Sequence, residues 1–159
     1  MMTIMFSTLK NNLFCRMETE MAQFISENKI ATICCLDSEN RPHCFNCFYA
    51  EDLKDHLLFF KSSGDTLHSR LLLESPYIAG TILPEKTEML SLKGIQLTGT
   101  VLYPGNSGYI NGNYIYHLRF PFAKMMPGEI WCIQLSTVKM TGSRNIFRKK
   151  LKWSKPPVA

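Results

Sequence analysis

Short runs of apolar residues, separated by polar clusters, predict a chain of β-strands with a few short helices between them. Between residues 18 and 28 the apolar positions recur at helical spacing, which predicts a short first helix. Further along, β-branched and apolar runs indicate strands, and clusters of turn-forming residues separate them. The predicted strands cover residues 29–36, 43–51, 56–61, 77–83, 87–103 and 130–140.

Two more helices and a basic C-terminal segment complete the predicted order. Residues 66–74 form a predicted helix with Ser63 or Asp65 as its N-cap, and residues 113–118 form another. In the long strand, Gly94 and Gly99 mark bulges or a close approach of two backbones. A turn over residues 141–145 leads to a basic strand or arm over residues 146–153. Six or so strands that bend and turn in this way predict a mainly β fold, an antiparallel β-barrel with short α-helices.

Length and composition are those of one globular domain. Of the 159 residues, 45% are hydrophobic and 19% are charged, which excludes a wholly disordered chain. We expect residues 17–155 to form a single barrel domain and residues 1–16 to be a weakly ordered N-terminal extension, with Met17 or Met21 as alternative starts. The first residues lack the continuous apolar centre of a signal peptide. No apolar run reaches the about 18 residues that span a membrane, so a cytoplasmic protein without a membrane partner is expected.

Positive charge is concentrated at the C-terminal end. The net charge is +5, and the segment that follows residue 143 holds a run of basic residues. They are Arg144, Arg148, Lys149, Lys150, Lys152 and Lys155. No RNA-binding or DNA-binding motif accompanies them, so a solvated charged end is favoured over a nucleic-acid partner.

The six cysteines do not have the spacing of a disulfide scaffold or of a zinc site. Cys44 and Cys47 form a CxxC sequence, but they lie in a predicted strand, where residues three apart point to opposite faces. A second CxxC or a histidine pair is missing. We therefore expect buried, reduced thiols of a cytosolic protein and no metal site.

The segment 57–73 carries the best candidate for a binding site. It passes from an apolar strand through a small polar loop into a helix, and the loop region contains Lys61, Ser62, Ser63, Thr66 and His68. Exposed backbone N–H groups and the positive end of a helix dipole favour an anion such as phosphate at such a place. The alternative is an ordinary capped loop, since capping residues precede most helices.

Three stretches in this order resemble a known family. They are Asn46-Cys-Phe-Tyr49 followed by Thr66-Leu-His68, then Gly94-Ile-Gln-Leu-Thr-Gly99, then Arg119-Phe-Pro-Phe-Ala-Lys-Met125 leading to Trp131 and Lys149-Lys-Leu-Lys-Trp153. Together they cover about residues 21–153. The chain resembles the pyridoxamine 5'-phosphate oxidase-like, FMN-binding split-barrel family, and within it a branch of small bacterial proteins.

The resemblance implies a homodimer of six-stranded antiparallel split barrels with FMN in a groove at the subunit interface. Ser62, Thr66 and His68 become the expected phosphate ligands. In the better known oxidases a lysine stands at the position of His68, and a neutral imidazole supplies one hydrogen bond without a full charge. Phosphate affinity is then expected to be weaker and to rise below about pH 6.5, unless Lys61 or a basic tail residue compensates.

The resemblance also places the flavin ring along the second predicted strand. The backbone of residues 44–48, which includes Cys47 and Phe48, would face the ring edge, and Asn46 would reach a ring oxygen or nitrogen. Gln96 would bond the ribityl chain or the ring. The alternatives are that Asn46 is a satisfied buried amide and that Gln96 is a sheet-surface residue.

The implied function is an FMN-dependent oxidoreductase that acts on an unknown small molecule. The substrate-phosphate arginines of true pyridoxamine phosphate oxidases match no stretch of this chain, so that activity is not transferred. No catalytic residue is predicted, because FMN itself carries the hydride and electron chemistry. One alternative is a non-catalytic flavin-binding or flavin-sensing dimer. Another is haem binding on the same barrel, with His43, His56 or His117 as the axial ligand.

Overall fold

The structure is a computed structural model that describes residues 17–86, 92–103, 111–144 and 147–157; the side chains of residues 143–149 are not among the described parts. The predicted N-terminal extension, residues 1–16, lies outside these ranges. So do residues 87–91, with which the predicted fifth strand was expected to begin.

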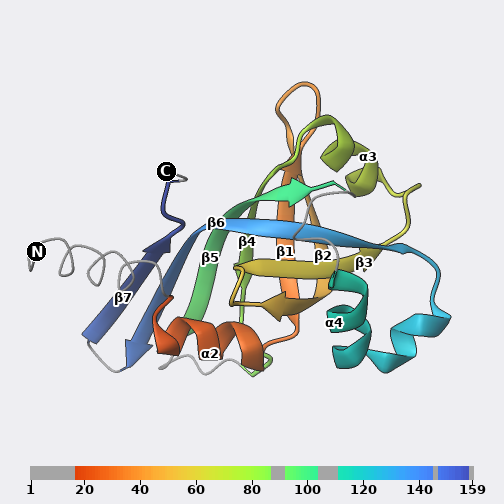
Figure 1. The fold of residues 1–159 in the computed structure, drawn as a ribbon. Coiled ribbons are helices and arrows are strands. Elements are labelled where there is room, and N and C mark those ends of the chain that lie inside the picture. The colour runs from red at the N-terminus through yellow and green to blue at the C-terminus, as the bar shows by residue number, and fades with distance from the viewer. Residues whose placement is uncertain (1–16, 87–91, 104–110, 145–146, 158–159) are drawn as a thin grey trace, which may run out of the picture.

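Six antiparallel strands form a closed barrel, and a seventh strand pairs with one of these six at the edge of the sheet (Figure 1). Their spatial order is β3-β2-β1-β4-β5-β6, and the pairing of β3 with β6 closes the barrel. β6 pairs with β3 through its first half and with β7 through its second half. The strands are β1 (Ile30–Leu36), β2 (Pro42–Asp52), β3 (Leu57–Ser62), β4 (Tyr77–Ile82), β5 (Lys93–Leu102), β6 (Glu129–Arg144) and β7 (Phe147–Ser154). The predicted fold class, a mainly β six-stranded antiparallel barrel with short helices, is confirmed.

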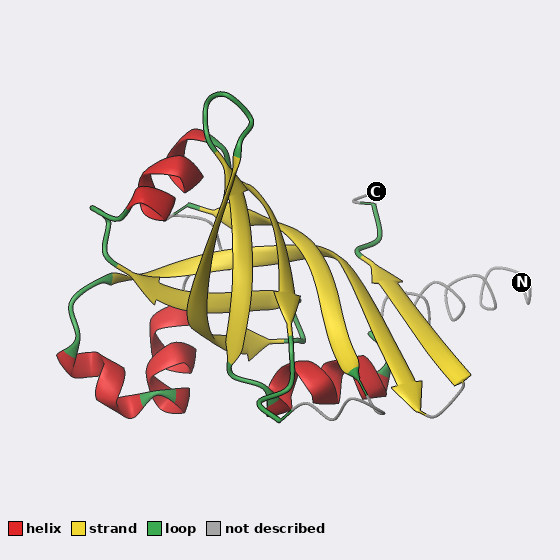
Figure 2. Cartoon of the chain, turned by 180° about the vertical axis from the view of Figure 1, so that it is seen from behind, coloured by secondary structure: helices red, strands yellow, loops and turns green. Residues whose placement is uncertain are grey.

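The helices lie around the barrel rather than inside it (Figure 2). They are α2 (Thr19–Glu27), α3 (Leu67–Glu74), α4 (Gly112–Arg119) and the 3-10 helix η2 (Pro121–Met125). Figure 2 shows α3 and α4 at the same side of the barrel, while α2 lies beneath it. None of the helices in the described part of the chain is long and apolar enough to cross a bilayer.

The apolar run of β3 is buried on both faces, which explains why it does not alternate. Leu58 and Phe60 point into the barrel and join the main core, where Met21 and Ile25 of α2 also pack. Leu57 and Phe59 point the other way into a second apolar cluster. That cluster also contains Ala50, Tyr116, Ala123, Ile130 and Cys132, so it lies between the barrel wall and α4.

Three local predictions are wrong. β6 does not turn over residues 141–145 but continues to Arg144, because its second half is held by antiparallel pairing with β7. His56 was expected to begin the third strand, yet it has a φ of 56° and belongs to the preceding turn. The N-cap of α3 is Thr66, not Ser63 or Asp65, and its Oγ1 accepts a hydrogen bond from the backbone N–H of Ser69.

The bend of β5 is located at one of the two expected glycines. The register between β5 and β6 shifts between Thr98 and Gly99. A Cβ at Gly99 would lie 2.6 Å from the carbonyl oxygen of Gln134, so the two backbones approach more closely than any side chain allows. Gly94 lies outside this shift. The prediction of a close backbone approach is therefore confirmed for Gly99.

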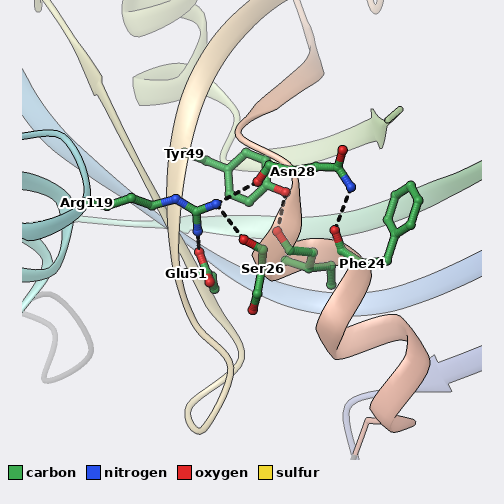
Figure 3. Close-up of polar contacts among 7 residues, drawn as sticks. Phe24, Ser26, Asn28, Tyr49, Glu51 and Arg119 are labelled. Carbon is green, nitrogen blue, oxygen red and sulfur yellow. Dashed lines mark hydrogen bonds and ion pairs between the residues drawn. The ribbon is translucent and has the colours of Figure 1, made fainter. Parts of the chain in front are cut away.

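Arg119, the last residue of α4, joins this helix to β2 and to the end of α2 (Figure 3). Its Nη1 forms an ion pair with Glu51. Its Nη2 donates to the carbonyl oxygens of Ser26 and Asn28, both at 2.8 Å. The guanidinium carbon also lies 5.6 Å from the ring centre of Tyr49. These contacts fix α4 against the barrel.

The end of α2 is held by two further hydrogen bonds in the same region (Figure 3). The buried side chain of Asn28 donates from Nδ2 to the carbonyl oxygen of Phe24 at 2.7 Å. The hydroxyl of Tyr49 donates to the carbonyl oxygen of Ile25 at 2.6 Å. The Asn28 side chain thus caps the last turn of α2, and the hydrogen bond from Tyr49 attaches this helix end to β2.

Candidate functional site

A cavity of about 380 Å³ lies between β2, β3, the start of α3 and the α4–η2 segment. Its volume is within the range of about 300–1,000 Å³ that is usual for small-molecule sites. Most of its lining is aromatic or aliphatic, with a polar group at one side. The lining residues are Phe45, Asn46, Cys47, Phe48, Phe60, Lys61, Ser62, His68, Tyr116, Phe120, Phe122, Ala123, Met126 and Pro127.

Hydroxyl groups gather at the polar side, where β3 ends and α3 begins. The Oγ of Ser62 lies 2.7 Å from Nε2 of His68 and 3.3 Å from Oγ1 of Thr66. The hydroxyl of Ser69, on the first turn of α3, donates to the carbonyl oxygen of Ser63 at 2.8 Å. Hydroxyls, an imidazole and the N-terminus of a helix are therefore within one network, which is a chemistry suited to an anion.

His68 connects this network to the apolar wall. Its ring stacks on that of Phe45, with 3.9 Å between the centroids and 10° between the planes. Burial lowers the pKa of His68 below its ordinary value, and electrostatic repulsion from nearby His43 lowers it further. His68 is therefore neutral near pH 7, and its Nε2 exchanges a single hydrogen bond with Ser62.

Lys61 lines the cavity and joins β3 to the α4–η2 segment. Its Nζ donates to the carbonyl oxygen of Ala123 at 2.6 Å and lies 3.4 Å from Nε2 of His117. The Nδ1 of His117 is 3.0 Å from the carbonyl oxygen of Asn113 and must carry the proton there, so Nε2 accepts from the lysine. An ammonium group has three donors, so these contacts leave Lys61 able to donate once more.

The three predicted residues of β2 lie at the other side of the cavity. Asn46 is exposed, and its Oδ1 accepts from the Thr32 hydroxyl at 2.7 Å, which leaves its Nδ2 as a donor. Asn46 is thus not the buried amide of the alternative interpretation. Burial raises the pKa of the Cys47 thiol to about 12, so this thiol stays protonated. The Phe48 side chain is 53% exposed, and its ring lies 5.6 Å from that of Phe120.

The structure thus brings most of the predicted site residues together. Lys61, Ser62 and His68 line the cavity along with the residues from β2, while Ser63 and Thr66 stand next to it in the hydroxyl network. Gln96 is not in this group.

Gln96 lies on the outer face of β5, away from the residues that line the cavity. It is exposed there, and its Oε1 accepts from Nζ of Lys139 at 3.2 Å. This is the environment expected for the sheet-surface alternative. Its role in cofactor binding stays a prediction.

Several cavity residues were not predicted from the sequence as site residues. Phe45 and Phe60 face the cavity from neighbouring strands, and Tyr116, Phe122 and Met126 reach it from α4 and the segment after it. A usable signal was the stretch 120–127, which is rich in apolar residues without the spacing of a strand or a buried helix.

The cysteines fulfil one prediction and contradict another. Cys44 is exposed on the outer face of β2 while Cys47 is half-buried on the opposite face, so the two sulfurs diverge as expected. The prediction of buried thiols holds for Cys35 and Cys132, but it is wrong for Cys44 because that position faces outward. Within the described ranges, no cluster of histidine, cysteine and acidic side chains could hold a metal ion.

The chain is similar in sequence to a group of bacterial proteins. No protein-family model matches the chain. The chain is 34% identical over 134 residues to a UPF0306 protein of Yersinia pseudotuberculosis (serotype O:1b, strain IP 31758). The match covers 84% of this chain and 90% of that protein.

Solved structures share the barrel at much lower sequence identity. A haem-binding protein from Mycobacterium smegmatis has a TM-score of 0.69 and 14% identity, over 83% of this chain and 56% of that protein. The chain thus spans about half the length of that protein. An FAD-binding protein from Mesorhizobium loti has a TM-score of 0.64 and 13% identity, over 80% of this chain and 96% of that protein. At these identities the likeness shows a shared split-barrel fold.

Proposed function

The chain belongs to the UPF0306 family, and we propose that it is an FMN-binding flavoprotein that acts as an oxidoreductase on a small molecule. One observation carries this proposal. A cluster of hydroxyl groups and His68 at the start of α3 lies at one side of a cavity whose opposite walls are aromatic. A phosphate and a flat, largely apolar ring are the two parts of FMN, and they need these two environments. The same fold in a flavin-binding protein and in a haem-binding protein supports a cofactor of this type.

The polar side fits the phosphate of FMN. Ser62 and Thr66 offer hydroxyl groups, His68 offers a ring nitrogen, and the first turn of α3 offers the positive end of its dipole. Lys61 adds a full positive charge and a donor at the cavity wall. Charged donors give hydrogen bonds of about twice the strength of neutral ones, so Lys61 would supply part of the attraction that the neutral imidazole lacks.

The apolar side fits the isoalloxazine ring. Phe48, Phe120 and Phe122 provide apolar surface that excludes water, and Nδ2 of Asn46 provides a donor that can orient a ring oxygen or nitrogen. Bound FMN would supply the transfer of hydride or electrons, which no side chain around the cavity can supply. The protein's contribution is then to bind the cofactor, orient its ring and limit the access of water.

A homodimer would complete the site. Apolar side chains of α4, η2 and the residue after η2 are largely exposed, and Phe122 and Met126 among them line the cavity. They are Tyr114 (71%), Leu118 (67%), Phe122 (81%), Met125 (80%) and Met126 (63%). Exposed apolar residues in such a group usually mark an interaction surface, and a second copy of the chain would cover them.

The absorption spectrum of the purified protein, before and after addition of FMN, tests the proposal. We expect the protein to be yellow, or to bind added FMN at micromolar concentrations with a change in flavin fluorescence. Ser62→Ala should weaken binding, whereas the control Ser38→Ala, in the exposed turn between β1 and β2, should not. A protein that binds no FMN at tens of micromolar, or a Ser62→Ala variant that binds like the control, would refute the placement of the site.

Two other functions are separated by the same sample. A bound flavin that neither NADH nor NADPH reduces, and that oxygen does not turn over, would indicate a non-catalytic flavin-binding or flavin-sensing dimer. A Soret band would indicate haem. The haem-binding protein with the same fold is the reason to look for this band. The residues favour flavin, because Nε2 of His117 already accepts from Lys61, and His56 packs on Trp153 away from the cavity lining.

A further inference from the structure

Two cysteine thiols face each other across neighbouring strands on the outer surface of the barrel. Cys34 of β1 and Cys44 of β2 are direct partners in the antiparallel register. Neither is in a disulfide; Cys44 is exposed and Cys34 is half-buried.

The position in the ladder gives this pair the spacing that a disulfide needs. The backbone N–H of Tyr49 donates to the carbonyl oxygen of its opposite residue Lys29, which makes that rung a hydrogen-bonded pair. Rungs alternate along an antiparallel ladder, so the Cys34–Cys44 rung is a non-hydrogen-bonded pair. The Cα atoms of such a pair are about 4.5 Å apart, and the side chains of non-hydrogen-bonded pairs lie closer together than those of hydrogen-bonded pairs. Disulfides join Cα atoms about 4.4–6.8 Å apart.

The two thiols influence each other. Partial burial raises the pKa of Cys34, and a hydrogen bond and charge from Cys44 raise it further. Cys44 is the exposed member of the pair, so it is the sulfur that a solvent oxidant can reach, while Cys34 lies half-buried beside it. The neighbouring rungs on this face, Thr32–Asn46 and Leu36–Pro42, carry no charge that would compete.

We propose that Cys34 and Cys44 form a redox-active dithiol, a covalent modification site that hydrogen peroxide converts into an intramolecular disulfide. The Cys44 thiolate attacks one peroxide oxygen, the O–O bond breaks, and a sulfenic acid forms as the first water is released after proton uptake. The Cys34 sulfur then attacks the Cys44 sulfur, the S–O bond breaks and the second water leaves. Two thiols lose two hydrogens in total, and one peroxide is reduced to two waters.

The other described cysteines lack this arrangement. Cys35 is buried, and its thiol points to the carbonyl oxygen of His43 at 3.6 Å. Burial raises the pKa of Cys47 and of Cys132 to about 12 in both cases. The Cys34–Cys44 pair is thus the place in the described structure where an exposed thiol lies next to a second thiol. Surface disulfides of this kind are reducible, so the modification should be reversible.

Mass spectrometry of the folded protein tests the proposal. The reduced protein, with Cys15 replaced by serine, is treated with about one equivalent of hydrogen peroxide, quenched with iodoacetamide under denaturing conditions and weighed. We expect a species that has lost two hydrogens and takes up two fewer alkyl groups, runs as a monomer on a non-reducing gel and returns to the reduced mass with dithiothreitol.

Serine variants locate the reaction. Cys34→Ser and Cys44→Ser should each abolish the loss of two hydrogens, whereas the matched control Cys47→Ser should retain it. Phenylarsine oxide, which requires two adjacent thiols, should bind at one equivalent to the parent protein and protect it from peroxide. The proposal is overturned if the parent shows no intramolecular disulfide, if the product is an interchain disulfide, or if either variant reacts like the parent. None of these readouts depends on FMN.

Discussion

Replacement of Arg119 should weaken the folded state strongly, because this side chain holds three partners, one on β2 and two at the end of α2. Its ion pair with Glu51 leaves only 19% of the arginine side chain and 16% of the glutamate side chain exposed, and two carbonyl oxygens complete its contacts. Removal of one partner from a buried pair destabilises by about 3–5 kcal/mol. Since this pair retains some exposure, we expect about 3 kcal/mol for Arg119→Ala and about 1–2 kcal/mol for Arg119→Lys, which keeps the charge but loses the planar fork.

The free energy of unfolding, measured with urea, checks this expectation. Arg41 is the matched control, since it also has two acidic partners, Asp37 and Glu39, but its side chain is 68% exposed. Arg41→Ala should therefore change stability far less, because solvent screens exposed pairs. If Arg119→Ala and Arg41→Ala lower the free energy of unfolding equally, the Arg119 contacts do not hold α4 in place. A folded Arg119→Lys protein should also bind FMN more weakly, since α4 forms one wall of the cavity.

Three further predictions concern the loop and the barrel. A bound phosphate raises the lowered pKa of His68, so the affinity for FMN should increase as pH falls from about 8 to 6. The His68→Lys variant should bind FMN more tightly at about pH 8 and lose this pH dependence. Fluorescence titrations of both proteins check this, because the titration of FMN itself affects both equally and drops out of the comparison. Thr66→Val should reduce stability by about 1 kcal/mol through loss of the N-cap and weaken FMN binding, and an unchanged melting temperature would contradict the first part. Gly99→Ala should lower the stability by about 1–3 kcal/mol, because the added Cβ would meet the carbonyl oxygen of Gln134. The control Gly64→Ala has open space around the added Cβ and should not lower it. Equal melting temperatures of the two variants would show that β5 and β6 can move apart at Gly99.

The strands could be predicted from the sequence where the evidence is local. The β-branched, apolar run of β1 and the turn cluster after it are properties of neighbouring residues, so their positions agree with the structure within about two residues. The length of β6 could not be predicted in this way. Thr141 and Gly142 have turn-forming character, but pairing with Lys149 and Lys150 of β7 keeps them extended. Long-range pairing overrides local preference at this point.

The candidate site also combines features that neighbouring residues predict with features that depend on long-range packing. Ser62, Thr66 and His68 lie within one short segment, so their common location could be inferred before the structure was known. The aromatic walls could not be inferred, because Phe45 and Phe122 come together only through the packing of α4 and its extension against the barrel. The Cys34–Cys44 pair is also a product of strand register, which a single sequence does not specify.

The lysines of β7 have a consequence for association of the protein with itself. In the described part of the chain β7 ends the sheet, so its outer edge presents backbone groups that no other strand pairs. Such an edge is a template on which another chain can add a strand and begin an aggregate. Lys150 and Lys152 are both exposed on β7, and lysine on an edge strand disfavours this because a docking strand would have to desolvate or approach the charges. The basic segment at the end of the sequence, first considered for contacts with anions, thus disfavours strand addition at the open edge that β7 leaves in the described sheet.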